Sequence, residues 1–172
     1  HLGLPFDVQR DPVDEADVWA DPALSHCPSS RTAPDPDAVD AAAERIAKAR
    51  APIVICGGGV VISGAEGELA ALAELLGAAV VTSISGQGSL PETHPLCAGV
   101  VGSNGGTAPT RAVVDAADLV IFVGCRAGSV TTERWRHPKQ GTPVIHIDVD
   151  AAVMGANYRA EAALIGDARL SL

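Results

Sequence analysis

An arginine and several glycines follow the apolar runs of this sequence, where buried strands are expected to end. The stretch "ADLVIFVGCRAGSVTTERW", residues 117–135, shows the pattern most clearly: an apolar run stops at Gly124, and Arg126 follows two residues later. Glycine lets the backbone approach another group closely, and a guanidinium can neutralise a diphosphate or stack on a ring. These residue types suit a site for a phosphorylated ligand.

Comparable residues follow the other apolar runs. Gly57 to Gly59 precede a helix that is expected to begin at Ser63, and their N–H groups could face a phosphate. Asp148 could accept a hydrogen bond from a ribose or ribityl hydroxyl, or it could instead cap the turn at 151–152. Each glycine could instead serve a tight turn, and Arg126 could instead form an ion pair on the surface. Only the convergence of these residues at one edge of one sheet indicates a site. The candidate cofactor-binding residues are Gly57, Gly58, Gly59, Gly86, Gly102, Gly106, Gly124, Arg126 and Asp148.

Alternating strands and helices must position these candidates. Helices are predicted after an Asp35 cap with Pro36 at its first position, over 63–77 with Ser63 and Glu66 in capping-box spacing, and from the "GSNGGTAPT" loop through Asp115. Strands that are apolar on both faces and separated by helices predict a parallel sheet covered on both sides. The expected fold is therefore α/β and doubly wound, with a six-stranded, mostly parallel sheet and helices on both faces. Its strands are expected within 52–56, 78–84, 96–101, 118–124, 143–150 and 162–166.

In such a sheet, ligands bind at the carboxyl ends of the strands. All the candidate residues fall in segments that follow strands or end them, so they are expected to meet at one edge. The Rossmann fingerprint of dinucleotide-binding enzymes is absent, because the first strand is followed by "GGGVVISG" and the second by no acid placed for a ribose.

Composition and charge exclude several classes of function. The formal net charge of −9 disfavours nucleic-acid and anionic membrane partners. No apolar run approaches the roughly 20 residues of a membrane span. The cysteines are far apart, which favours structural thiols and a cytoplasmic location over disulfides or a metal site. Residues 1–34 are rich in proline and acids and are interpreted as a linker, with 35–172 as the folded domain.

No complete catalytic constellation is recognisable. His94 and His137 lie in polar loops, while His146 falls inside a strand and is interpreted as a core or edge residue. No two of the histidines and cysteines stand at metal-ligand spacing. Glu92 and Glu133 are interpreted as loop acids without an evident partner. The sequence thus predicts neither catalytic nor metal-binding residues in this chain.

The order of the motifs resembles the central domain of thiamine-diphosphate-dependent enzymes of the acetolactate synthase and 2-oxo-acid decarboxylase superfamily. The likeness runs from about Pro36 to the C-terminus and is carried by three stretches. The opening "HLGLPFDVQ" resembles the end of the preceding pyrimidine-binding domain. The three stretches are "APIVICGGGVVISGAEGELAALAELLGAAVVTSISGQGSLPETHPLCAGVVG", "AADLVIFVGCRAGSVTTERW" and "VIHIDVDAAVMGANYRAEAALIGDA".

This resemblance implies a non-catalytic central domain with a Rossmann-like, FAD/NAD-binding type of fold. Pyrimidine- and diphosphate-binding domains of the same parent chain would hold thiamine diphosphate and Mg²⁺, and the parent would be a homo-oligomer, dimeric or tetrameric. In relatives the central domain binds FAD or ADP, or it is empty and structural. Here "GCRAGSVTT" keeps Arg126, but Gly128 and Ser129 replace acids of the flavin-dependent acetolactate synthases.

Two alternatives belong to other classes. The first is a stand-alone dinucleotide-binding module of the electron-transfer flavoprotein or transhydrogenase type. The second is an NAD-dependent deacylase, which would need a catalytic histidine beside a nucleotide pocket and usually a zinc cluster of four cysteines. The scattered cysteines disfavour the deacylase.

Overall fold

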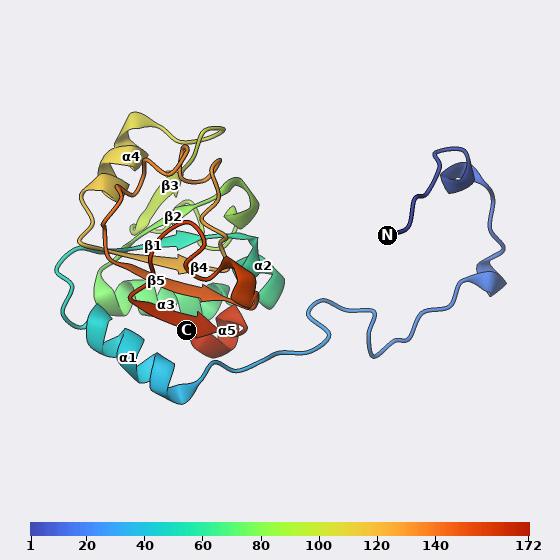
Figure 1. The fold of residues 1–172 in the computed structure, drawn as a ribbon, viewed down its shortest axis with the longest axis horizontal. Coiled ribbons are helices and arrows are strands. Elements are labelled where there is room, and N and C mark those ends of the chain that lie inside the picture. The colour runs from blue at the N-terminus through green and yellow to red at the C-terminus, as the bar shows by residue number, and fades with distance from the viewer.

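A six-stranded parallel sheet forms the centre of the fold in the computed structural model, which describes residues 1–172 (Figure 1). The strand order is β3-β2-β1-β4-β5-β6, and every neighbouring pair runs parallel. The prediction of a doubly wound α/β fold is confirmed, and the sheet is parallel throughout rather than mostly so. The strands are β1 (Pro52–Cys56), β2 (Ala79–Thr82), β3 (Cys97–Val100), β4 (Leu119–Val123), β5 (Val144–Asp148) and β6 (Ala162–Ile165).

Alternate residues of each central strand enter opposite cores, which explains their continuous apolar character. In β4, Leu119, Ile121 and Val123 belong to one buried cluster. Val120 and Phe122 belong to the other. All five residues are at most 3% exposed, so the strand is buried on both faces.

Helices cover both faces unequally (Figure 1). One face packs against helices that contribute Ala42, Val60, Leu69 and Ala168 to its core. The other face is covered by a single helix together with the irregular segment 124–143 and Tyr158. The helices of the first face are α1 (Pro36–Ile46), α2 (Gly58–Ser63), α3 (Glu66–Leu76) and α5 (Ala168–Ser171), and the helix of the second is α4 (Ala108–Asp115).

Local signals place most helix ends. The Asp35 side chain accepts from the Asp37 N–H at the start of α1, with Pro36 as its first residue, as predicted. Thr107 and Thr110 form a capping box at the start of α4. Gly77 ends α3 in the left-handed conformation. None of the helices combines the length and apolar character that a membrane span requires.

The predicted start of a helix at Ser63 is wrong. A short helix, α2, begins directly after β1 and ends at Ser63, Gly64 turns the chain with φ of +63°, and α3 begins at Glu66. The Ser63 hydroxyl donates to Asp167 Oδ1 at 2.8 Å instead of capping the next helix. The Ser63 side chain therefore binds Asp167, which is distant in sequence, although the local pattern predicted that it would cap a helix.

Residues 1–30 are exposed nearly throughout and lie away from the sheet in Figure 1. The segment joins the folded body at Arg31, whose Nη1 lies 2.7 Å from Asp167 Oδ1 and 2.8 Å from Ser63 Oγ. Thr32 O accepts from the Asp167 N–H at 2.8 Å. We call Arg31, Ser63 and Asp167 the anchor cluster.

Candidate functional site

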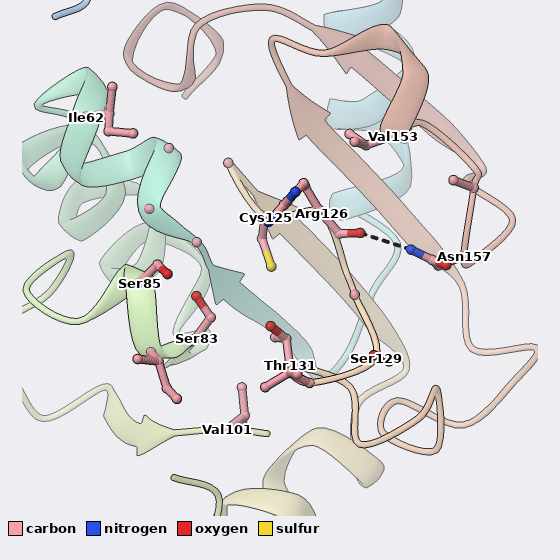
Figure 2. Close-up of a pocket in the computed structure, with 18 of the residues that line it drawn as sticks. Ile62, Ser83, Ser85, Val101, Cys125, Arg126, Ser129, Thr131, Val153 and Asn157 are labelled. Carbon is pink, nitrogen blue, oxygen red and sulfur yellow. Dashed lines mark hydrogen bonds between the residues drawn. The ribbon is translucent and has the colours of Figure 1, made fainter. Parts of the chain in front are cut away.

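A cavity of about 730 Å³ opens at the carboxyl ends of the strands, where β1 and β4 lie side by side (Figure 2). The chain leaves β1 toward β2 and leaves β4 toward β5, so the order of the sheet reverses between them. This is the switch point at which open parallel sheets leave a crevice for ligands. Its walls come from the segments after the first five strands, β1 to β5. They comprise Gly57, Gly58, Gly59, Ile62, Ser83, Ile84, Ser85, Val101, Gly124, Cys125, Arg126, Gly128, Ser129, Val130, Thr131, Ala152, Val153, Ala156 and Asn157.

Five of the nine candidate residues line this cavity. Gly57 lies between β1 and α2, Gly58 and Gly59 begin α2, and Gly124 and Arg126 follow the end of β4. The other four, Gly86, Gly102, Gly106 and Asp148, lie outside its walls. The structure therefore brings the first and fourth loops together around one space, as the strand order requires.

The glycines of this edge are required because backbones approach each other closely. A Cβ on Gly57 would collide with the carbonyl oxygen of Gly124. One on Gly59 would lie 2.6 Å from the Gly124 Cα, and one on Gly86 would collide with the carbonyl oxygen of Cys56. Gly124 has φ of +53°, which disfavours other residues. These glycines let the loops after β1, β2 and β4 pack against one another.

The N–H groups of these glycines are already used by the fold. Gly57 N donates to Val123 O at 2.9 Å, Gly59 N to Gly124 O at 3.1 Å, and Gly124 N to Ile147 O at 2.8 Å. Gly86 N and Gly106 N likewise donate to nearby carbonyls. These five residues therefore do not offer the expected free amides, because their N–H groups already donate hydrogen bonds to backbone carbonyls.

The free polar groups of the cavity are side chains. Arg126 is exposed, and its guanidinium makes no hydrogen bond or ion pair within the chain, while its carbonyl accepts from Asn157 Nδ2 at 3.2 Å (Figure 2). The hydroxyls of Ser85, Ser129 and Thr131 also lack partners within the chain. No aspartate or glutamate lines the cavity, so Arg126 is its only charged residue. This lining favours an anionic ligand with hydrogen-bonding groups.

Cys125 lines the cavity, His146 contacts the Cys125 carbonyl from behind the wall, and both residues are buried. Burial raises the pKa of the Cys125 thiol to about 11, so the sulfur in the wall is protonated near neutral pH. His146 is 2% exposed, which places it in the core, and its Nε2 lies 2.8 Å from Cys125 O. Burial lowers the pKa of His146, although the contacts with Cys125 O and Asp148 act in the opposite direction. A neutral His146 that donates from Nε2 fits this geometry.

Two acids have roles that differ from their interpretation in the sequence. Asp148 accepts from the Asp150 N–H at 3.1 Å, and Asp150, rather than Asp148, caps the turn at 151–153. Glu133 is not partnerless: its Oε1 accepts from Arg111 Nε at 2.5 Å, and the side chain is 9% exposed. The partner lies 22 residues away in α4, where no local pattern indicates it.

Sequence reasoning also missed several cavity residues. Ser83 and Ser85 lie just after β2, and Thr131 lies in the segment that follows β4 and contains Arg126. Their position after strand ends was therefore a usable signal. Asn157 had no such signal, because it reaches the wall from an irregular loop after β5. Across residues 1–172, no group of three or more His, Cys, Asp or Glu side chains is arranged to hold a metal ion.

Comparison with known proteins identifies the family. A family model described as "Thiamine pyrophosphate enzyme, central domain" matches residues 39–172. The chain is 39% identical to a probable acetolactate synthase large subunit from Methanocaldococcus jannaschii, over 98% of this chain and 29% of that protein. It is 39% identical to a probable 2-ketoarginine decarboxylase from Pseudomonas aeruginosa, over 100% of this chain and 29% of that protein. The chain thus spans less than a third of the length of these relatives.

A solved structure agrees on the fold. Benzoylformate decarboxylase from Polynucleobacter necessarius superposes with a TM-score of 0.68 at 24% identity, over 97% of this chain and 30% of that chain. The alternative of an electron-transfer flavoprotein or transhydrogenase module has no support from these matches. The resemblance found in the sequence is confirmed: the chain belongs to the family of central domains of thiamine-diphosphate-dependent enzymes.

Proposed function

We propose that the cavity at the switch point holds the phosphorylated part of FAD or ADP, with Arg126 as the cation that pairs with it. The observation that carries the proposal is an unpaired guanidinium in a cavity that has no carboxylate. A guanidinium matches the geometry of phosphate oxygens. Ser85, Ser129 and Thr131 would supply neutral hydrogen bonds, and Gly57, Gly59 and Gly124 would shape the wall instead of binding the phosphate.

We further propose that the chain is the non-catalytic central part of a longer enzyme acting on 2-oxo acids, by acetolactate synthase-like carboligation or by decarboxylation. The similarity to a probable acetolactate synthase and to a probable 2-ketoarginine decarboxylase supports this proposal. Thiamine diphosphate and Mg²⁺ would be held by a pyrimidine-binding domain, joined to residues 35–172 through the linker 1–34, and by a diphosphate-binding domain of the same parent chain. When bound, thiamine diphosphate supplies the nucleophile and the electron sink for cleavage beside a carbonyl. A homo-oligomeric parent in the cytoplasm fits this assignment and the four free thiols.

Titration of the 172-residue chain with ADP and with FAD, followed by calorimetry, tests the nucleotide site. Arg126→Met is expected to weaken binding about tenfold to a hundredfold, the loss typical of a charged hydrogen bond. Arg50→Met is the matched control, since Arg50 is also exposed but precedes β1 at the opposite edge of the sheet. Absence of binding to the unsubstituted chain would contradict the proposal and leave a structural role for the cavity.

A further inference from the structure

One wall of the cavity has no regular secondary structure of its own. Residues 126–131 follow β4 in an irregular conformation, and five of them line the cavity. A wall of this kind keeps one shape only if contacts further along the chain fix it. The next residues, 132–136, carry those contacts. The five lining residues are Arg126, Gly128, Ser129, Val130 and Thr131.

Those next residues form a left-handed turn without glycine. Glu133, Arg134 and Trp135 have φ of 50°, 60° and 59°. This conformation is disfavoured for residues that carry a Cβ, so the surroundings must hold it. The Thr132 hydroxyl donates to Gly128 O at 3.0 Å and accepts from the Trp135 N–H at 3.1 Å, and Thr132 is 0% exposed.

The same turn is tied directly to the wall. Arg134 N donates to Ser129 O at 2.7 Å, and Ser103 N donates to Val130 O at 2.8 Å. A Cβ on Gly102 would lie 2.9 Å from the Thr131 Cα. A shift of the turn would therefore move Ser129, which lines the cavity, whereas the contacts of Val130 and Thr131 hold the wall against the loop after β3.

A partly buried ion pair holds the turn against α4. Glu133 Oε1 accepts from Arg111 Nε at 2.5 Å, and the other side of Arg111 donates from Nη2 to Gly106 O at 3.3 Å. Gly106 leaves room for the carboxylate, since a Cβ there would lie 3.1 Å from Glu133 Oε1. Arg136 Nη2 is 3.9 Å from Oε2 but is 69% exposed, so Arg111 is the main partner.

We propose that Glu133, acting through Arg111, is a positioning residue that fixes the wall 126–131 and thereby sets the affinity of the cavity for its ligand. The affinity part of this inference rests on the proposed nucleotide site. Glu133 itself does not line the cavity. The pair anchors one side of a strained turn, and the opposite side of that turn supports the wall.

The test compares Glu133→Gln with Glu161→Gln, which removes a pair between Glu161 Oε2 and Arg45 Nη1 at 3.2 Å away from the cavity walls. Amide hydrogen exchange is measured along the chain, and ADP and FAD affinities are measured by calorimetry. Glu133→Gln is expected to speed exchange in 126–135 and to weaken binding, each by about tenfold, while β1 and β4 exchange as before. Glu161→Gln is expected to change neither.

Arg111→Met provides a second route to the same answer. The double variant Glu133→Gln with Arg111→Met should weaken binding no more than either single variant, because both remove one contact. Unchanged exchange in 126–135, or an increase spread evenly over the sheet, would overturn the inference. If the unsubstituted chain binds neither ADP nor FAD, the proposed site fails, and the exchange data alone decide whether Glu133 fixes the wall.

Discussion

The glycines after β1 and β2 lie where three loops share a space too small for side chains. Gly59 illustrates this, because a Cβ there would lie 2.6 Å from the Cα of Gly124. Gly59→Ala is expected to destabilise the fold by about 3 kcal/mol, because two backbones must separate. Gly67→Ala is the control: Gly67 lies in α3 with open space around it, and alanine should stabilise the helix by about 0.5–1 kcal/mol. Urea unfolding of both variants measures the difference, and equal midpoints would contradict the close packing.

His146 gives the fold a dependence on pH. Its pKa in the folded state lies below the ordinary value of 6.5, so the neutral form is favoured by folding. The unfolded chain therefore takes up the proton first as pH falls below 6.5, and stability is lost at up to about 1.4 kcal/mol per pH unit until the folded pKa is reached.

His146→Gln is expected to flatten this dependence, since an amide can still donate to Cys125 O but does not titrate. The free energy of unfolding measured from about pH 7.5 to pH 5 tests the effect. His26→Gln is the control substitution, because His26 is exposed. A slope that persists in His146→Gln would assign the dependence to another group.

At the scale of the elements, some features are set by local sequence signals and others by contacts between residues distant in the sequence. The apolar run of β4, the Asp35 cap and Gly77 at the end of α3 act through near neighbours, so the sequence alone predicts them. Ser63 and Glu133 take partners 104 and 22 residues away, and both were misassigned. The candidate site follows the same division: the strand ends that meet were predictable, but the use of glycine amides by neighbouring carbonyls was not.

The anchor cluster joins three elements and predicts a large effect for one carboxylate. Asp167 caps α5, accepting from the Arg169 and Leu170 N–H groups, and also pairs with Arg31 and Ser63. Asp167→Asn is expected to cost about 2–3 kcal/mol, because asparagine can still cap α5 but the largely buried ion pair with Arg31 is broken. Asp150→Asn is the control: it keeps an oxygen that caps an exposed turn, breaks no ion pair, and should cost less than about 1 kcal/mol.

The effect of Asp167→Asn should depend on pH. Burial alone would raise the pKa of Asp167, but hydrogen bonds from Ser63, Arg31 and Leu170 outweigh it and leave the pKa below 3.8. Ionised Asp167 therefore stabilises the fold above pH 3.8, and this contribution disappears as pH falls through the folded pKa. The difference in free energy of unfolding between the unsubstituted chain and Asp167→Asn, measured in urea, should shrink as the pH falls. A constant difference would show that the charge of Asp167 does not stabilise the anchor cluster.

For the whole molecule, the anchor cluster separates a segment that contributes little to folding from one that contributes much. Large apolar side chains of residues 1–30, such as Leu2 at 85% and Trp19 at 84% exposed, bury little surface. Pro34 in contrast is buried beside Gly166, and Arg31 pairs with Asp167. We therefore expect residues from Arg31 onward, and not residues 1–30, to contribute to the free energy of unfolding.

Two deletions test this boundary. Removal of residues 1–29 should leave the free energy of unfolding within about 0.5 kcal/mol of that of the full chain. It should also reduce self-association, because exposed apolar groups are lost. Removal of residues 1–34 should cost about 2 kcal/mol or more, because Asp167 then stays buried without its guanidinium partner. Equal stability of the two deletions, measured in urea, would mean that the contacts of Arg31 in the anchor cluster contribute nothing to folding and that the domain begins at α1.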